Sequence, residues 1–253
     1  MRTNFFGLTD IGKKREFNED RYLCADFSDA VPEEKRPLHL FAVADGIGGH
    51  AGGEEASSLA VQTLRETLEP GIRSGSGDIA GPELIEEAFH RANEIIFRKS
   101  TETDRLAGMG TTLVAALVSG MRTVAANVGD SRLYLVRGKT LTQISRDHSW
   151  AAEQLRLKVL SENDVARSPF RNIVTRSLGF AASVSVDTFE VELKDQDYLL
   201  LCTDGLYGPL GERGILRVFK KHHGPTDICR RLVHLAEKSG GRDNITAVVV
   251  QVF

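Results

Sequence analysis

The chain has 253 residues, of which 41% are hydrophobic and 26% are charged, and this composition is typical of a globular protein rather than a disordered one. The formal net charge of −3 argues against a nucleic acid or an anionic membrane as a partner. No apolar run approaches the ~18 residues of a membrane span, the first residues lack the apolar core of a signal peptide, and the three cysteines follow no ligand spacing. We therefore expect a cytoplasmic protein without membrane insertion.

In chain order, the predicted elements begin with strands at residues 21–26 and 38–44. Apolar residues at helical spacing then predict helices at 54–68 and 83–97, joined by a loop at 70–82. Further apolar runs predict strands at 111–118, 123–128, 132–136 and 198–202, followed by a helix at 226–238 and a last strand at 245–252. This order lacks the βαβ alternation of a doubly wound parallel sheet. We predict an α+β fold of two packed sheets with helix pairs outside, in one domain spanning residues 1–253.

Acidic residues recur where the predicted strands begin or end. They are Glu19, Asp20, Asp45, Asp130, Asp204 and Asp243. Any one Asp-Gly pair is an ordinary turn, but carboxylates gathered at strand ends would repel one another unless a cation neutralised them. Carboxylate and carbonyl oxygens suit Mg²⁺ or Mn²⁺, whereas zinc needs His or Cys spacings that this sequence lacks.

Such a cluster suits hydrolysis of a phosphate ester. Two ions ~3.5–4 Å apart activate a shared water for in-line attack on a phosphoryl group. Asp45 at a strand end can reach both ions, and Gly46 lets the backbone carbonyl approach them. Arg15 is a candidate to bind phosphate oxygens in a fork, although a lone Arg is more often a solvated surface residue.

The glycine-rich stretch after Asp45 has a rival interpretation. Gly46, Gly48 and Ala51 formally match the dinucleotide fingerprint G-x-G-x-x-A. However, Asp45 would place a negative charge beside the pyrophosphate, and the element after the next helix is another helix rather than a strand. We therefore reject nucleotide binding here.

Seven motifs, in order, resemble those of the metal-dependent serine/threonine phosphatases, the PPM or type 2C family. They lie at residues 9–20 (TDIGKKREFNED), 43–57 (VADGIGGHAGGEEAS), 108–113 (GMGTTL), 128–137 (VGDSRLYLVR), 146–149 (RDHS), 203–206 (TDGL) and 241–246 (GRDNIT). The DGIGGH form and the compact length resemble the bacterial branch. The resemblance implies a four-layer αββα sandwich of two antiparallel sheets flanked by antiparallel helix pairs.

The resemblance also implies roles for the acidic residues. Asp45 would bridge two tightly bound Mn²⁺ or Mg²⁺ ions, and the carbonyl of Gly46 would bind the second of them. Asp204 and Asp243 would hold the first ion. Asp20 and Glu19 would bind metal or the water on it. Asp130 would help to hold a third, weaker ion together with Asp204. Arg15 would bind the phosphate of the substrate. Arg15, Asp20 and Asp45 are thus the expected catalytic residues.

The sequence also departs from the family pattern. Animal members carry a His directly after the Asp-Gly pair, and here that position is Ile47. His50 lies three residues on, and we do not transfer the role to it; His50 is expected to cap the following helix and His148 to be structural. Residues 150–171 match the position of a variable flap near the site.

We therefore predict hydrolysis of phosphoserine and phosphothreonine in proteins, opposing a bacterial serine/threonine kinase, by an enzyme expected to be monomeric. A non-enzymatic regulator on this fold would be expected to have lost a metal ligand, and Asp20, Asp45, Asp204 and Asp243 are all present. A third reading is a dinuclear enzyme for a nucleotide or nucleic acid, against which the lack of a basic or aromatic stripe argues.

Overall fold

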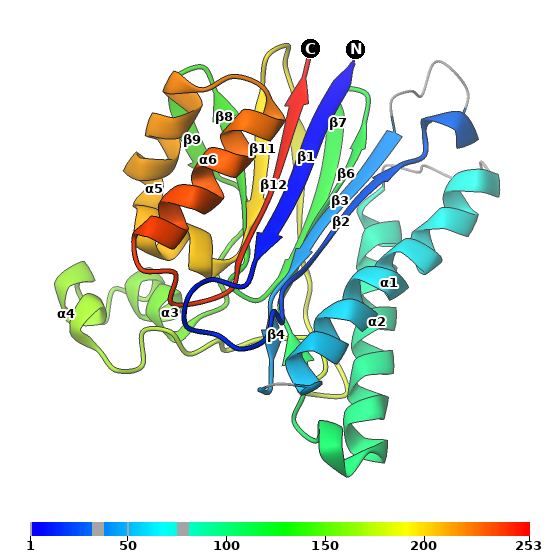
Figure 1. Cartoon of the computed structure of the whole chain (residues 1–253). Helices are drawn as coiled ribbons and strands as arrows, with labels where there is room; N and C mark the ends of the chain where they lie inside the picture. Colours follow the sequence, from blue (N-terminus) through cyan, green and yellow to red (C-terminus); the bar gives the residue numbers. More distant parts are fainter. Residues whose placement is uncertain (1, 32–37, 50, 75–80) are drawn as a thin grey trace.

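Two antiparallel five-stranded sheets form the middle of the structure, a computed structural model that describes residues 2–31, 38–49, 51–74 and 81–253 (Figure 1). One sheet has the order β1-β12-β11-β8-β9, with strands Thr3–Asp10, Ile245–Val252, Tyr198–Cys202, Arg132–Arg137 and Thr140–Gln143. The other has the order β10-β7-β6-β3-β2, with strands Asp187–Glu192, Arg122–Val128, Leu113–Ser119, Leu38–Ala44 and Arg21–Asp26. A short ladder pairs β4 (Gly46–Ile47) with β5 (Gly110–Thr111).

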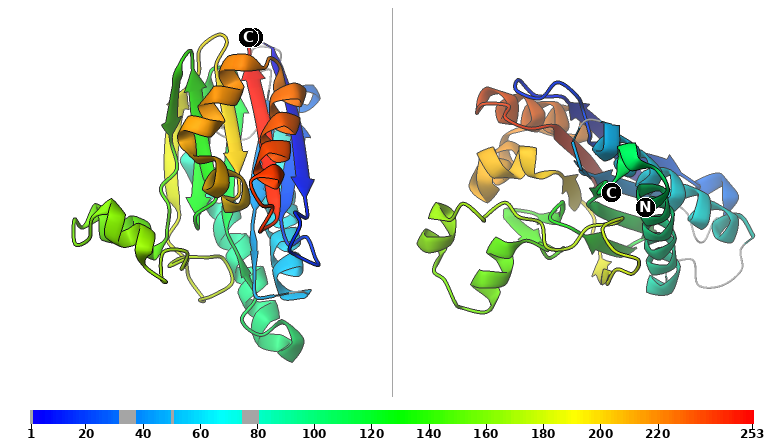
Figure 2. Two further views of the ribbon diagram at one scale, coloured as in Figure 1. Left: turned by 60° about the vertical axis from the view of Figure 1, so that its left-hand side comes forward. Right: turned by 90° about the horizontal axis from the view of Figure 1, so that it is seen from below.

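Helix pairs cover the outer faces of the two sheets. Helices α1 (Ala51–Ser74) and α2 (Pro82–Glu102) run antiparallel over the β10–β2 sheet, and α5 (Asp204–Lys221) and α6 (Pro225–Lys238) cover the β1–β9 sheet (Figures 1 and 2). Helices α3 (Trp150–Arg156) and α4 (Glu162–Arg167) project to one side. The predicted four-layer αββα sandwich is confirmed.

Three apolar layers hold the sandwich together because each sheet buries both of its faces. Phe41, Val114 and Leu199 lie in the layer between the sheets. Leu64 packs in the layer under α1 and α2, and Leu232 packs in the layer under α5 and α6. All five side chains are fully buried or nearly so, which explains the near-continuous apolar runs of the central strands.

One end of the sandwich gathers the strand ends that carry acidic residues. Cys202 at the end of β11 pairs with Arg132 at the start of β8 and with Ala247 near the start of β12. In the other sheet, Ala44 at the end of β3 pairs with Arg21 at the start of β2. Five carboxylates therefore lie next to this end: Asp20, Asp45, Asp130, Asp204 and Asp243.

Strands β2, β3, β11 and β12 have the predicted bounds, and two other predictions need correction. The strand predicted at 111–118 is interrupted at Thr112, whose backbone N–H donates to the carbonyl of Asp45 instead of continuing a ladder. The loop predicted from Pro70 is wrong up to Ser74, because α1 continues and buries Ile72 in the core. The rest of that loop, residues 75–82, lies outside the described residues except for its last two positions, 81 and 82. Strands β1, β9 and β10 and helices α3, α4 and α5 were not predicted.

Membrane insertion can be assessed only from the helices that are described. Each of them is too short or too polar to cross a bilayer.

Candidate active site

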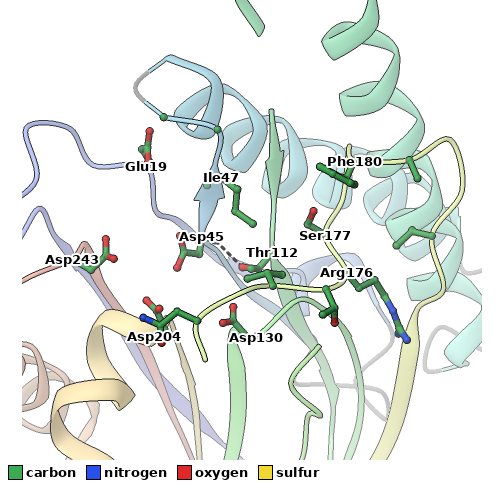
Figure 3. A pocket seen from close by; sticks show the side chains of 18 of the residues that line it. Glu19, Asp45, Ile47, Thr112, Asp130, Arg176, Ser177, Phe180, Asp204 and Asp243 are labelled. Carbon is green, nitrogen blue, oxygen red and sulfur yellow. Dashed lines mark hydrogen bonds between the residues drawn. The ribbon is translucent and has the colours of Figure 1, made fainter. Parts of the chain in front are cut away.

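A pocket of about 690 Å³ opens at the acidic end of the sandwich (Figure 3). All but one of the residues predicted for the site line it: Arg15, Glu19, Asp45, Gly46, Asp130, Asp204 and Asp243. The exception, Asp20, is 1% exposed and lies behind the lining. The structure thus brings together side chains that lie more than two hundred residues apart in the sequence.

Asp45 is held by its backbone at the point where β3 ends. Its N–H donates to Oγ1 of Thr112 at 3.0 Å, and its carbonyl accepts from the N–H of Thr112 at 2.9 Å and from Oγ1 of Thr111 at 2.8 Å. Desolvation raises the pKa of the Asp45 carboxyl well above its usual range, and the negative charges of Asp20 and Asp204 raise it further. Such a carboxylate favours a bound cation.

Gly46 and Gly205 allow close backbone contacts around the pocket. A Cβ on Gly46 would lie 2.2 Å from the carbonyl oxygen of Gly53, and one on Gly205 would lie 1.9 Å from that of Asn244. Both positions therefore require glycine. These contacts pack the chain after Asp45 against α1, and the start of α5 against residue 244.

Asp20 has one satisfied oxygen and one that makes no hydrogen bond to a described residue. Its Oδ2 accepts from Oγ1 of Thr203 at 2.9 Å and from Oγ1 of Thr246 at 2.7 Å, whereas the buried Oδ1 has no partner within the described part of the chain. Burial raises the pKa of Asp20 to about 7, and the charge of Asp204 adds to the shift. A buried carboxylate oxygen without a hydrogen bond indicates a ligand or a cation nearby.

Asp204 and Asp243 approach the pocket from the start of α5 and from the chain before β12. Desolvation raises the pKa of Asp204 to about 6, and the charge of Asp243 contributes to the rise. The side chain of Asn244 accepts from the N–H of Glu19 at 2.9 Å and donates to the carbonyls of Ile11 and Phe17 at 3.0 and 2.9 Å. Asn244 therefore fixes the loop at residues 11–19 next to Asp243.

Arg15 lies at the rim of the pocket, where its side chain is half-exposed. Nη2 donates to Oδ2 of Asp243 at 2.8 Å, and this hydrogen bond raises the pKa of the guanidinium above its usual value. The guanidinium has five donors, so one bond to Asp243 leaves others that can face a phosphate.

Asp130 is held by a side-chain network behind it. Its carbonyl accepts from the hydroxyl of Tyr207 at 3.0 Å, and the Arg132 guanidinium stacks 3.8 Å from the centre of the Tyr207 ring. Arg132 is in turn bound by both carboxylate oxygens of Asp147, at 2.6 to 3.1 Å. Burial raises the pKa of Asp130 to about 7, with a smaller contribution from Asp204.

The residues present fit divalent cations. The donors are carboxylates with backbone carbonyls nearby, the set that Mg²⁺ and Mn²⁺ prefer, and Asp20 Oδ1 is an orphaned buried acceptor. Among the described residues, no three His, Cys, Asp or Glu side chains are closed around one point as a metal cage. The carboxylates therefore surround a pocket rather than a finished cage, which leaves room for water in the coordination shell.

The family model of protein phosphatase 2C matches residues 15–247. The chain belongs to the protein phosphatase 2C family. It is 37% identical over 243 residues to the serine/threonine phosphatase stp of Listeria welshimeri, covering 96% of this chain and 93% of that protein.

Solved structures extend this likeness to the fold. The S. agalactiae serine/threonine phosphatase superposes with a TM-score of 0.86 at 32% identity and covers 100% of both chains. The catalytic domain of the phosphatase PstP, in complex with 2 manganese ions, superposes with a TM-score of 0.83 at 29% identity, covering 98% of this chain and 97% of that one. The chain is therefore a bacterial-type protein-serine/threonine phosphatase, of a metal-dependent family.

The phosphatase carries no His directly after its Asp-Gly pair, since Ile47 occupies that place at the pocket. The predicted capping role of His50 lies outside the described residues. His148 is 6% exposed; its Nδ1 accepts from the N–H of Gly129 at 3.0 Å, and its Nε2 lies 2.9 Å from Nη1 of Arg176. These contacts agree with the structural role predicted for His148.

One wall of the phosphatase pocket was missed by sequence reasoning. None of residues 150–171, the predicted flap, lines the pocket, whereas the segment that follows provides much of its wall. That segment contributes Asn172, Val174, Thr175, Arg176, Ser177, Phe180, Ala181, Ser183, Val184 and Ser185. Its sequence has neither an apolar period nor a chemical motif, so no local signal marked it.

Proposed function

We propose that this phosphatase hydrolyses phosphoserine and phosphothreonine at a centre of two Mn²⁺ or Mg²⁺ ions. The observation that carries the proposal is the gathering of Asp45, Asp204 and Asp243 around one pocket with Arg15 at its rim. The 2 manganese ions bound to the related PstP catalytic domain support the class of metal.

In this proposal, Asp45 would help to hold both ions, and the carbonyl of Gly46 would help to hold the second. Asp204 and Asp243 would hold the first ion, and Glu19 and Asp20 would bind metal or an adjacent water. Asp130 would hold a third, weaker ion together with Asp204. The positions of these residues at one end of the sandwich support the assignment, as do the motifs they share with the family.

When bound, the cations supply Lewis-acid activation of water and neutralise charge on the phosphoryl group. The guanidinium of Arg15 binds phosphate oxygens and orients the ester at the rim of the pocket. Thr203 and Thr246 hold Oδ2 of Asp20, so Oδ1 is left to accept a hydrogen bond from a water molecule at the centre. This fixed acceptor helps to orient the water and to take up its proton.

We also propose that residues 1–253 act as one catalytic domain, because the two sheets share an apolar layer. The proposed substrates are proteins phosphorylated by a bacterial serine/threonine kinase, as the family membership suggests. Action as a monomer in the cytoplasm remains a prediction from the sequence.

The enzyme is expected to prefer phosphoserine and phosphothreonine peptides over a phosphotyrosine peptide by about tenfold or more in kcat/KM. The ester oxygen of phosphoserine is one bond from Cβ, so its peptide backbone reaches the pocket wall when the phosphate reaches the carboxylates. A phosphotyrosine ring holds the backbone farther away. Phosphate release from matched peptides with Mn²⁺ present measures the preference; absence of hydrolysis of all three peptides would refute the proposed function.

Replacing Arg15 by alanine is expected to raise KM for a phosphopeptide about tenfold, with a smaller change in kcat. The guanidinium contacts phosphate in both the ground state and the transition state, so its loss weakens binding generally. Steady-state kinetics at saturating Mn²⁺ separate the two constants. Saturating metal also offsets any change in metal affinity that follows from losing the hydrogen bond between Arg15 and Asp243.

The neighbouring Lys14→Ala variant is a matched control, because Lys14 does not line the pocket and its replacement by alanine removes the same positive charge. It should retain the KM of the wild type. A large fall in kcat with unchanged KM in the Arg15→Ala enzyme would instead make Arg15 a group that acts only in the transition state.

A further inference from the structure

Buried hydrogen bonds hold one short stretch of the pocket wall, residues 177–182. Leu178 is fully buried, and its N–H and carbonyl pair with the backbone of Thr111 at 2.9 and 3.0 Å. Asn93 on α2 accepts from the N–H of Gly179 at 2.9 Å and donates to the carbonyl of Ala181 at 3.0 Å. With both flanks tied to the core, the residue between Gly179 and Ala181 has a fixed position.

Gly179 directs the next side chain away from the core. Its φ is +85°, and a Cβ there would lie 2.2 Å from Cγ2 of Ile96 on α2. The backbone therefore packs directly on the helix, and Phe180 stands on the outer side. At 77%, Phe180 has the highest exposure of any large hydrophobic side chain in the described part of the chain.

This exposed ring lies at the pocket and not elsewhere on the surface. Phe180, Ile47 and Val184 all line the pocket that the carboxylates line. Figure 3 shows Ile47 and Phe180 across the pocket from Asp204 and Asp243. The pocket therefore has an acidic half and a second half in which apolar side chains lie among polar ones such as Arg176 and Ser177. Folding gains little from a ring exposed to this degree, and its place beside Ile47 and Val184 at the pocket leaves its apolar surface available to a ligand.

The two halves define what can fill the pocket. The acidic half, with its cations, takes the phosphate of the substrate. Successive side chains of an extended peptide point to opposite sides, and residues are spaced by ~3.3 Å, so the side chain two positions from the phosphorylated residue lies about 7 Å away and points into the same pocket. A rigid ring loses little conformational entropy when it contacts such a side chain, which makes it an effective binding surface.

We propose that Phe180, together with Ile47 and Val184, forms an apolar subsite for a large apolar side chain two positions from the phosphorylated residue of the substrate. The proposal rests on the proposed phosphatase function and extends it to the class of peptide preferred. Its occupant is a side chain of the substrate itself, because the subsite is continuous with the pocket that binds the phosphate.

The test uses the full chain with saturating Mn²⁺ and short phosphothreonine peptides that differ at one position, two residues before or two residues after the phosphothreonine. That position holds leucine, alanine or aspartate. The wild type is expected to prefer leucine over alanine by about tenfold in kcat/KM at one or both positions. Phe180→Ala should reduce the preference to about twofold or less, and Phe180→Leu should retain most of it, because leucine restores an apolar surface.

Phe253→Ala is the matched control: it removes a partly exposed Phe at the far end of the sandwich and should leave the preference unchanged (Figure 1). Melting temperatures of all variants confirm folding. Equal kcat/KM for leucine and alanine peptides at both positions would overturn the subsite, while hydrolysis of those peptides would still support the phosphatase function. Hydrolysis of no peptide would refute both.

A Phe180→Ala variant that keeps the full leucine preference would also overturn the subsite. If that variant has also lost a dimer that the wild type forms on gel filtration, Phe180 contacts a second copy of the chain rather than the substrate.

Discussion

Replacing Asp45 by asparagine is expected to lower kcat/KM for a phosphopeptide by more than ~100-fold. The amide has nearly the shape of the carboxylate but lacks its negative charge and one of its two anionic donors. In the proposed site Asp45 serves both cations, so this one change weakens both. Initial rates over a wide range of Mn²⁺ concentration measure the loss and show whether added metal restores activity.

Stability distinguishes this loss of metal binding from misfolding. Because desolvation and neighbouring carboxylates raise the pKa of Asp45, its charge opposes folding in the metal-free protein. The asparagine variant should therefore melt at the same temperature as the wild type or higher when chelator is present. Asp29→Asn, on an exposed turn outside the pocket, is the control and should keep full activity. A loss smaller than about 100-fold for Asp45→Asn would contradict the bridging role.

The central strands were predictable because burial on both faces leaves a direct trace in the sequence. Strands β3 and β12 are apolar almost throughout, and their bounds follow from the polar residues that flank them. The acidic cluster was predictable for a related reason: carboxylates at the ends of several strands must meet if those strands end at one edge. The family motifs then assigned the roles.

Features that depend on contacts between distant segments were not predictable. Helix α5 contains Pro209 and has Gly211 at a φ of +60°, so its sequence resembles a turn-rich loop. The strand β10 alternates weakly and lies at a sheet edge, where burial imposes little pattern. The position of Phe180 follows from Asn93 and Thr111, which lie on other elements.

Asp20 illustrates the same limit within the site. The sequence placed it among the metal-binding residues, but its neighbour Thr203 lies beside β11 and its neighbour Thr246 lies on β12. Only the folded structure shows that these two hydroxyls bind one carboxylate oxygen and that the other has no hydrogen bond to any residue whose position is described.

Removal of metal is expected to abolish hydrolysis, by more than ~1000-fold, and to make stability depend on pH in a particular direction. Burial and neighbouring charge raise the folded-state pKa of Asp204 to about 6 and of Asp20 and Asp130 to about 7. In the unfolded chain these groups titrate near ~3.9. Between these values the folded state binds more protons, so the metal-free protein loses stability as pH rises from about 4 to about 7.

Bound cations remove this dependence because they neutralise the same carboxylates, and they bind more tightly as the ligands lose protons. The increase in melting temperature on adding saturating Mn²⁺ should therefore be larger at pH 8 than at pH 5, by more than about 5 °C. Burial lowers the pKa of His39 and His148, which destabilises the protein at acid pH, but both histidines are present in the two forms and their effect cancels in the difference. Calorimetry of metal-free and Mn²⁺-loaded protein at both pH values measures this difference between the two increases in melting temperature. An equal increase at the two pH values, or full activity in chelator, would mean that the carboxylates around the pocket do not hold the metal.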